Sequence, residues 1–322
     1  MELFLGIEGG GTNTRAVLAQ ADGQILGVGW GGPSNALFVG REAASKAIKQ
    51  AISQALAQKR ERLKCKVIAA CIPGVNKELL QLTLKPLMEW EHLILCSDTL
   101  SALQAGLGPE GVGVVVSSGT GSFAIARNKK GDIAVVGGWG PLLGDEGSGY
   151  YIGLLGLKAI IHAADGIGPP TCLTRAIIER LGLTNPLELR RVAYSGVLDR
   201  KSIAELSQVV MVMAKEGDKA ALSIIKKAAW WLVVMARAVV RKAGLENEIP
   251  VVFVGGVARE RVIVEIFKRY LDKLLPGAVY TPPLFPIELG SLLLAYKEGG
   301  ISLKESTLHQ VKTTYSSILK SI

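Results

Sequence analysis

The sequence predicts an α/β protein that contains two related units. Residues 3–28 and 112–136 each read as an apolar strand, a small-residue loop ending in Gly-Thr, a second strand, a polar turn with glycine and a third strand. These landmarks recur at a constant offset of 108 positions, so that Gly11-Thr12 and Gly23 match Gly119-Thr120 and Gly131. After the first meander, strands alternate with helical stretches, which is typical of a mixed α/β sheet. One duplicated unit explains the repeat better than two coincidences.

The first unit continues beyond its three strands with helices and strands in alternation. The pattern predicts a helix over about 41–59, a strand over 66–71, a helix near 77–89, a strand over 92–96 and a helix over 99–107. The glycine-rich residues 106–113 are the best candidate for a boundary before the second meander.

The second unit contains a long helical section over about 146–244, interrupted near 166–170, 185–186 and 216–218. A strand over 249–254, a glycine pair and a helix that begins near Ala258 follow. A last helix over about 286–298 comes after a proline-rich turn and can return to the first domain. We therefore expect two domains, and their bounds are residues 1–106 with a C-terminal helix over about 288–322, and residues 107–287 with a helical insertion.

The composition is that of a globular protein. Of the 322 residues, 49% are hydrophobic and 20% are charged, which allows two domains with a sizeable core. The four cysteines form no CxxC pair and have no metal-like spacing with the three histidines, which indicates reduced thiols in a cytoplasmic protein. The net charge of +9 is scattered along the chain, and the apolar run 228–236 is too short to cross a bilayer. We expect neither nucleic acid nor a membrane as a partner.

The first Gly-Thr loop is predicted to bind phosphate. It lies between two strands, whereas a dinucleotide-binding motif opens a helix and a P-loop requires Gly-Lys followed by Ser or Thr. The functional interpretation that remains is a tight turn whose N–H groups and Thr12 hydroxyl grip phosphate, with Glu8 near a Mg²⁺ ion or its waters. The alternative is an ordinary glycine-rich hairpin, which the recurrence at residues 117–122 makes less attractive. Two such loops facing each other across a cleft can hold the two ends of a polyphosphate.

A third glycine pair, Gly255-Gly256, ends an apolar strand and precedes a helix that carries Arg259 and Arg261. Glycine at this point permits a flat ligand such as adenine or ribose to lie against the backbone, and the amides at a helix N-terminus favour anions. A plain strand-to-helix turn explains the pair equally well.

Asp98 stands just past the carboxyl end of the predicted strand 92–96, where α/β sheets present catalytic groups. A carboxylate there can accept a proton from an attacking hydroxyl. The alternative is that Asp98 caps the N-terminus of the helix over 99–107.

The string GGWGPLLGDEGSG, residues 137–149, is the most specific segment of the chain. Its six glycines cost backbone entropy, which indicates a loop that approaches a ligand. Trp139 can supply an apolar face, and Asp145 can accept hydrogen bonds from sugar hydroxyls. The alternative is that Asp145 or Glu146 is a first-turn acid of the next helix. Asn35 is a weaker candidate, because Pro-Ser-Asn is also a routine turn.

Together these motifs resemble the N-acetylglucosamine kinases and the related BadF-type ATPases of the actin-like sugar kinase superfamily. The resemblance extends over about residues 3–298, and GGWG-x-x-x-GDEGS is its most specific piece. It implies two ribonuclease-H-like domains, with ATP and a sugar meeting in the cleft between them. It also explains the repeat by duplication.

The resemblance implies a role for each matching position. Asp98 is the base that deprotonates the 6-hydroxyl of an amino sugar, N-acetylglucosamine or glucosamine. The implied sugar contacts are Asn35, Asp98, Gly138, Trp139 and Asp145. The implied contacts with ATP are Gly10, Gly11, Thr12 and Asn13 in the first loop, Gly119, Thr120 and Gly121 in the second, and Gly255 and Gly256 for the adenosine. Related kinases also suggest Mg²⁺ as a cofactor and a homodimer.

One position departs from the family pattern, and two other functions stay open. The first loop of the family usually begins with Asp, whereas this chain has the longer Glu8 where Mg²⁺ geometry is demanding. The first alternative is an ATPase activator that drives electrons into a dehydratase or reductase. That class shares an iron–sulfur cluster between subunits, which needs two cysteines from each, and only Cys172 lies in a plausible segment. The second alternative is a sugar sensor without turnover.

Overall fold

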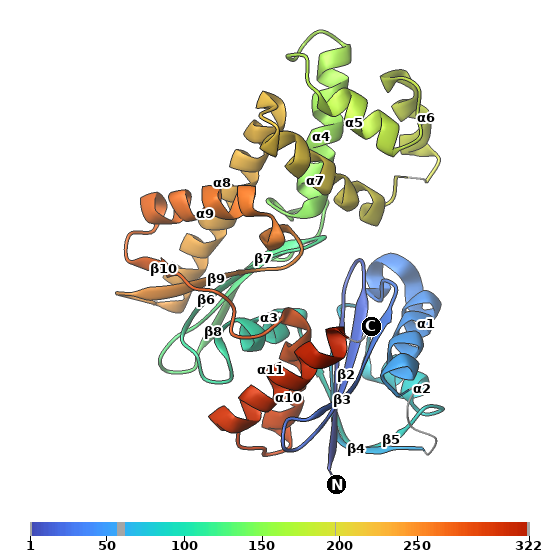
Figure 1. Ribbon diagram of the computed structural model, residues 1–322, viewed down its shortest axis with the longest axis vertical. Helices are drawn as coiled ribbons and strands as arrows, with labels where there is room; N and C mark the ends of the chain where they lie inside the picture. The colour runs from blue at the N-terminus through green and yellow to red at the C-terminus, as the bar shows by residue number, and fades with distance from the viewer. Residues whose placement is uncertain (1, 57–61, 197, 321–322) are drawn as a thin grey trace. The chain divides into compact units, whose positions relative to one another are not determined.

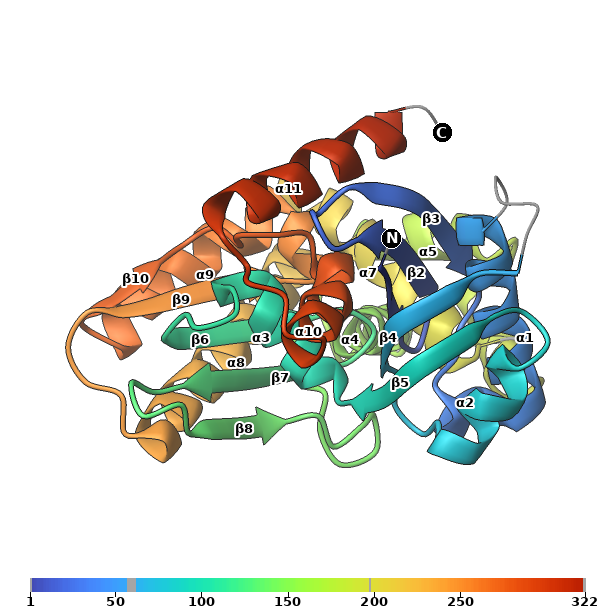
Figure 2. The same cartoon turned by 90° about the horizontal axis from the view of Figure 1, so that it is seen from below.

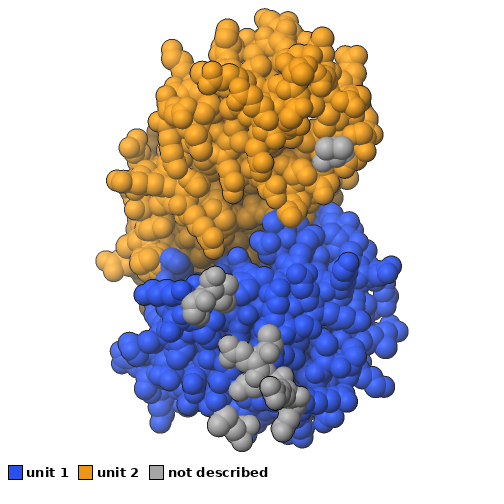
Figure 3. All heavy atoms as spheres, turned by 45° about the vertical axis from the view of Figure 1, so that its right-hand side comes forward, with its two compact units in different colours: residues 1–111, 283–322 blue, residues 112–282 orange. Residues whose placement is uncertain are grey.

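The computed structural model describes residues 2–56, 62–196 and 198–320, and the chain divides into two compact units (Figure 1, Figure 3). Unit 1 comprises Met1–Gly111 and Pro283–Ile322, and unit 2 comprises Val112–Pro282. Each unit contains one five-stranded sheet with helices. The prediction of an α/β fold is confirmed.

The sheet of unit 1 is a meander extended by two parallel strands. Its strands are β1 (Leu3–Gly9), β2 (Thr14–Gln20), β3 (Ile25–Gly31), β4 (Lys64–Cys71) and β5 (Glu89–Cys96). Strands β1, β2 and β3 pair antiparallel, while β4 is parallel to β1 and β5 to β4, which gives the order β3-β2-β1-β4-β5. The carboxyl ends of β1, β4 and β5 therefore share one edge of the sheet.

The sheet of unit 2 repeats this topology. Its strands are β6 (Gly113–Ser118), β7 (Ser122–Arg127), β8 (Ile133–Gly137), β9 (Ile249–Val254) and β10 (Ala278–Tyr280). Figure 2 shows them in the order β10-β9-β6-β7-β8, with β9 parallel to β6 and β10 parallel to β9. The meander and both parallel strands correspond to those of unit 1, as expected of a duplicated unit.

The helices of unit 1 cover both faces of its sheet. One face packs against α1 (Ala36–Leu56) and α2 (Lys77–Leu84). The other packs against α3 (Asp98–Leu107), α10 (Gly290–Glu298) and α11 (Glu305–Lys320), with α10 against β1 and β4 and α11 against β3 (Figure 2). The C-terminal segment thus completes the core of unit 1. The last part of the helix predicted over 41–59 lies outside the described residues.

The helices of unit 2 form one core with its sheet. They are α4 (Gly149–Ala164), α5 (Leu173–Arg180), α6 (Leu189–Tyr194), α7 (Arg200–Lys215), α8 (Lys219–Ala243) and α9 (Arg261–Leu274). The buried face of α8 packs against β6, β7 and β8, while α4 packs against α7. In the described part of the chain, no helix combines the length and apolarity that crossing a bilayer requires.

Two predicted helices begin later than their sequence suggests. After Gly255-Gly256 the chain forms a single 3-10 turn, Val257–Arg259, and the extended backbone of Glu260 delays α9 to Arg261. Likewise, Pro286 is followed by a 3-10 turn, Ile287–Leu289, before α10 begins at Gly290.

Candidate functional site

The carboxyl edge of the unit 1 sheet carries a row of charged and thiol side chains. In the strand ladders Glu8 on β1 pairs with Arg15 on β2 and with Cys71 on β4, and Cys71 pairs with Cys96 on β5. Residues that pair directly across neighbouring strands point to the same face of a sheet. The four side chains therefore form one row, on the face that α3 and α10 cover.

Asp98 follows this row as the first residue of α3, two positions beyond the end of β5. The helix is capped by Ser97, whose side chain accepts a hydrogen bond from the N–H of Leu100 at 3.2 Å, so the interpretation of Asp98 as the N-cap is wrong. Burial raises the pKa of Asp98, against a hydrogen bond from the Thr99 N–H at 2.9 Å. A carboxylate with a raised pKa is a stronger proton acceptor than an exposed aspartate.

Glu8 carries an enclosed carboxylate oxygen. Its Oε2 is buried and has no hydrogen-bond partner among the described residues. Burial and the charge of Glu288 raise the pKa of Glu8 to about 8, against the opposing charge of Arg15 and with a further increase from Asp98. An enclosed carboxylate without a donor costs free energy unless it takes up a proton or a cation satisfies it.

The donor set around Glu8 fits a hard cation. Within residues 2–56, 62–196 and 198–320, no three His, Cys, Asp or Glu side chains are grouped as a metal site. Magnesium bound with a nucleotide needs only one or two carboxylates, because waters and phosphates supply its other ligands. The orphaned oxygen of Glu8, with the charge of Asp98 acting on it, meets that requirement.

The thiol of Cys71 lies near both carboxylates. Cys71 donates its S–H to Cys96, and this bond and burial raise the pKa of Cys71. The same bond lowers the pKa of Cys96, against the opposing effect of burial. The charges of Glu8 and Asp98 both raise the pKa of Cys71 further. Because both carboxylates act on one thiol, Glu8 and Asp98 belong to one electrostatic site.

The first Gly-Thr loop closes the edge of the sheet beside Glu8. Its ends are joined by a hydrogen bond from the Gly10 N–H to the Asn13 carbonyl at 3.1 Å. The Gly10 carbonyl in turn accepts from the N–H groups of Ser34 and Asn35, each at 3.1 Å. The Asn35 side chain is buried and its Oδ1 accepts from the Leu37 N–H. The structure therefore brings Asn35 together with the first loop.

The second Gly-Thr loop is held by two other segments of unit 2. The Gly119 N–H donates to Gly121, and the Gly119 carbonyl accepts from the first residue of α4, Gly149, at 2.8 Å. Gly255 has a φ of 101°, and a Cβ there would lie 2.3 Å from the carbonyl oxygen of Ser118. Only glycine lets the end of β9 approach the loop this closely.

Asp145 is buried against the second loop. Its carboxylate accepts from the Ser122 N–H at 3.2 Å and from Arg200 Nη2 at 2.7 Å. A Cβ at Gly121 would lie 2.9 Å from both Asp145 Oδ1 and Arg200 Nη2, which explains why the loop ends in glycine. Burial raises the pKa of Asp145, against the Ser122 N–H and the Arg200 charge. Arg200 belongs to α7, so no motif near Asp145 in the sequence could predict this partner.

Neither acid of this loop, Asp145 or Glu146, lies in the first turn of the helix that follows it. Helix α4 is capped by Ser148, whose hydroxyl accepts from the Tyr151 N–H, and its first turn contains no acidic residue. The interpretation of Asp145 or Glu146 as a first-turn acid is therefore wrong.

The tip of the same loop exposes apolar side chains. Trp139 is 73% exposed, Leu142 91% and Leu143 74%. Gly138, with a φ of 76°, donates its N–H to the Ser122 carbonyl at 2.9 Å and so joins the loop to β7. Exposed apolar side chains gathered on one loop are typical of a surface that meets a ligand.

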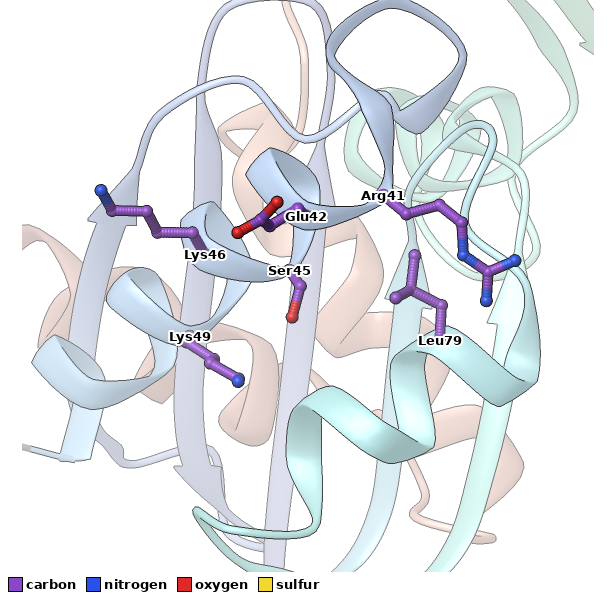
Figure 4. Close-up of a pocket in the computed structure, with 6 residues that line it drawn as sticks. All are labelled: Arg41, Glu42, Ser45, Lys46, Lys49 and Leu79. Atoms are coloured by element: carbon purple, nitrogen blue, oxygen red, sulfur yellow. The ribbon is translucent and has the colours of Figure 1, made fainter.

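A separate depression of about 540 Å³ lies on the outer side of α1 (Figure 4). Its lining consists of Arg41, Glu42, Ser45, Lys46 and Lys49 from α1 and Leu79 from α2. None of the predicted site residues lines it.

The chain matches one family model over most of its length, and curated relatives span it almost completely. Residues 5–295 match the BadF/BadG/BcrA/BcrD ATPase family. The chain is 32% identical to an N-acetyl-D-glucosamine kinase of Dictyostelium discoideum over 91% of this chain and 98% of that protein. It is 29% identical to an N-acetylmuramic acid/N-acetylglucosamine kinase of Clostridium acetobutylicum over 92% and 99%.

A solved structure agrees with these matches. A candidate N-acetylglucosamine kinase from Chromobacterium violaceum superposes with a TM-score of 0.75 at 25% identity, covering 92% of this chain and 99% of that one. The fold is that of the actin-like sugar kinases. The resemblance drawn from the motifs is confirmed, and the chain belongs to the BadF/BadG/BcrA/BcrD ATPase family.

Proposed function

We propose that this chain is an ATP-dependent kinase that phosphorylates an amino sugar, N-acetylglucosamine or glucosamine, at its 6-hydroxyl. The observation that carries the proposal is the grouping of Asp98, Glu8 and the first Gly-Thr loop at one edge of the unit 1 sheet. The curated relatives, which are kinases of N-acetylated amino sugars, support the class of acceptor.

Asp98 is the general base of this proposal. As the 6-oxygen attacks the γ-phosphorus, its O–H bond breaks and the proton passes to Asp98, while the bond from the γ-phosphorus to the bridging oxygen breaks and ADP leaves. The raised pKa of Asp98 makes this transfer more favourable than it would be to an exposed aspartate.

The two Gly-Thr loops bind the phosphates of ATP. Gly10, Gly11, Thr12 and Asn13 belong to the first loop, and Gly119, Thr120 and Gly121 to the second; their backbone N–H groups suit phosphate oxygens. Gly255 and Gly256 contact the adenosine. Glu8 holds Mg²⁺ or its waters, and the ion supplies neutralisation of phosphate charge when it is bound.

The sugar is bound by Asn35, Gly138, Trp139 and Asp145. Trp139 supplies an exposed apolar face, and Asp145 retains lone pairs beyond its bonds to Ser122 and Arg200. We further propose a cytoplasmic homodimer that acts on this small molecule and not on nucleic acid.

The test is ADP release measured with N-acetylglucosamine, glucosamine, glucose, N-acetylmannosamine and muramic-type sugars, with ³¹P NMR to locate the new phosphate. Asp98→Asn should lower kcat by about 10²–10⁴-fold. It should leave ADP affinity unchanged, and Asp272→Asn, an exposed change on α9, should behave as the original chain. A fully active Asp98→Asn protein contradicts the base. If the chain binds a sugar but releases no ADP with any of these acceptors, the sensor is favoured instead.

A further inference from the structure

A largely buried ion pair joins the C-terminal segment to the active edge of unit 1. Arg15 Nη1 lies 3.4 Å from Glu288 Oε1, and the two side chains are 22% and 9% exposed. Charges this enclosed are expensive to desolvate, and a well-packed apolar pair often serves stability as well. Neither the phosphate loops nor the proposed base accounts for this pair.

Arg15 faces two carboxylates and pairs with only one of them. Its ladder partner across β1 and β2 is Glu8, on the same face of the sheet. In the described part of unit 1, Arg15 forms its ion pair with Glu288. The Nε atom of Arg15 and the Oε2 atom of Glu8 are both buried and have no hydrogen-bond partner there. A guanidinium and a carboxylate side by side would ordinarily form two parallel hydrogen bonds. Because Arg15 pairs with Glu288, the Oε2 atom of Glu8 has no hydrogen-bond partner.

The position of Glu288 results from two close backbone contacts. A Cβ at Gly6 on β1 would lie 2.3 Å from the Leu292 nitrogen, and a Cβ at Gly290 would lie 1.9 Å from the Ser101 carbonyl oxygen. Glycine at both positions lets α10 approach β1 and α3, which places the preceding turn and Glu288 beside Arg15.

Tyr315 of the C-terminal helix α11 also lies beside Glu288 of this ion pair. Tyr315 of α11 is buried, and its pKa is raised by burial and by the charge and side-chain hydrogen bond of Glu288. A tyrosine hydroxyl next to a carboxylate donates to it. Glu288 is thus held from two sides, by Arg15 and by Tyr315.

We propose that Glu288 is a positioning residue that keeps Arg15 away from Glu8, so that the Glu8 carboxylate stays available to the divalent cation of the bound nucleotide. The inference rests on the proposed role of Glu8. Without the Glu288 charge, Arg15 turns to Glu8, and cation and guanidinium compete for one carboxylate.

The test measures Mn²⁺ binding in the presence of ADP, by the electron paramagnetic resonance signal of the free ion, together with the melting temperature of each variant. Glu288→Gln should weaken Mn²⁺ binding about tenfold, as changes behind a metal ligand do. The double variant Arg15→Met with Glu288→Gln should recover most of this loss, because the competing guanidinium is gone. Glu110→Gln is the matched control, since it breaks the exposed ion pair of Glu110 with Lys297 of the same C-terminal segment and should leave Mn²⁺ binding unchanged.

A purely structural role of Glu288 predicts that removing Arg15 does not restore Mn²⁺ binding. In that case the double variant binds Mn²⁺ no better than Glu288→Gln, and this result overturns the proposal, as does unchanged binding by Glu288→Gln. If Glu288→Gln does not fold, Tyr315→Phe, which keeps the ring, should still weaken binding in the same direction; normal binding by it is then the contradicting result. Mn²⁺ binding to ADP complexes does not require turnover, so a chain that follows this order but phosphorylates no sugar refutes the proposed function alone.

Discussion

The two units share one sheet topology and one loop but differ in the chemistry beside it. At the next-to-last ladder pair before the loop, unit 1 has Glu8 opposite Arg15, whereas unit 2 has Ser117 opposite Phe123. In unit 2 the buried acid is Asp145, which comes from a later loop and accepts a hydrogen bond from Arg200 at 2.7 Å. In unit 1 the arginine pairs with Glu288 and leaves Glu8 Oε2 without a partner. Both units have the Gly-Thr loop, while the placement of one arginine decides which unit has a carboxylate oxygen without a partner.

The largest expected difference between the units concerns Glu8. Glu8→Ala should reduce Mg²⁺-dependent turnover on the order of 100-fold, because it removes the oxygen that has no other partner. Glu8→Asp should retain far more activity, since it keeps a carboxylate one methylene shorter. Turnover measured against Mg²⁺ concentration checks this, and equal, mild effects of the two changes would contradict the role of Glu8.

A smaller effect is expected from the arginine of unit 2. Arg200→Met leaves the buried Asp145 charge without its 2.7 Å partner, so it should lower the free energy of unfolding by about 3 kcal/mol. Urea denaturation provides the measurement. Glu110→Gln, which breaks an exposed pair, should cost about 0–1 kcal/mol. If Arg200→Met is no more destabilising than Glu110→Gln, Asp145 does not depend on this pairing for its place beside the loop.

An effect confined to high pH distinguishes the thiols of the two units. Burial raises the pKa of Cys65 in unit 1 from 9.0 to about 12, so the unfolded chain loses this proton before the folded one does. The contribution to stability is complete below pH 9 and is lost as pH rises towards 12, by about 1.4 kcal/mol per pH unit.

Cys65→Ala should therefore flatten the decline of unfolding free energy above pH 9, measured by urea denaturation at several pH values. Cys172→Ala, at the exposed thiol of unit 2, is the control and should leave the slope unchanged. An unaltered slope in Cys65→Ala would show that this thiol does not ionise on unfolding in that range.

Local patterns predicted the backbone of the site well and its charge pairing poorly. The Gly-Thr loops and Asp98 follow strands whose apolar runs are visible in the sequence, so their place at a sheet edge could be predicted. Glu288 and Arg200 come from helical segments far along the chain, and no local rule specifies which strand such a segment meets. The alternative interpretation of Asp98 as the N-cap of α3 is wrong because Ser97, a neighbouring hydroxyl, takes that role. The short β10 had no pattern strong enough to predict it, and the C-terminal helix expected over about 288–322 is divided into α10 and α11.

The most direct test of the difference between the units compares Asp98→Asn with Asp145→Asn in one kinetic experiment. Asp98→Asn should lower kcat by about 10²–10⁴-fold with little change in sugar KM, as loss of a general base does. Asp145→Asn should act mainly on sugar KM and on stability, because that carboxylate is held by Arg200 and Ser122. If Asp145→Asn removes kcat while Asp98→Asn leaves it intact, the assignment of chemistry to unit 1 is wrong.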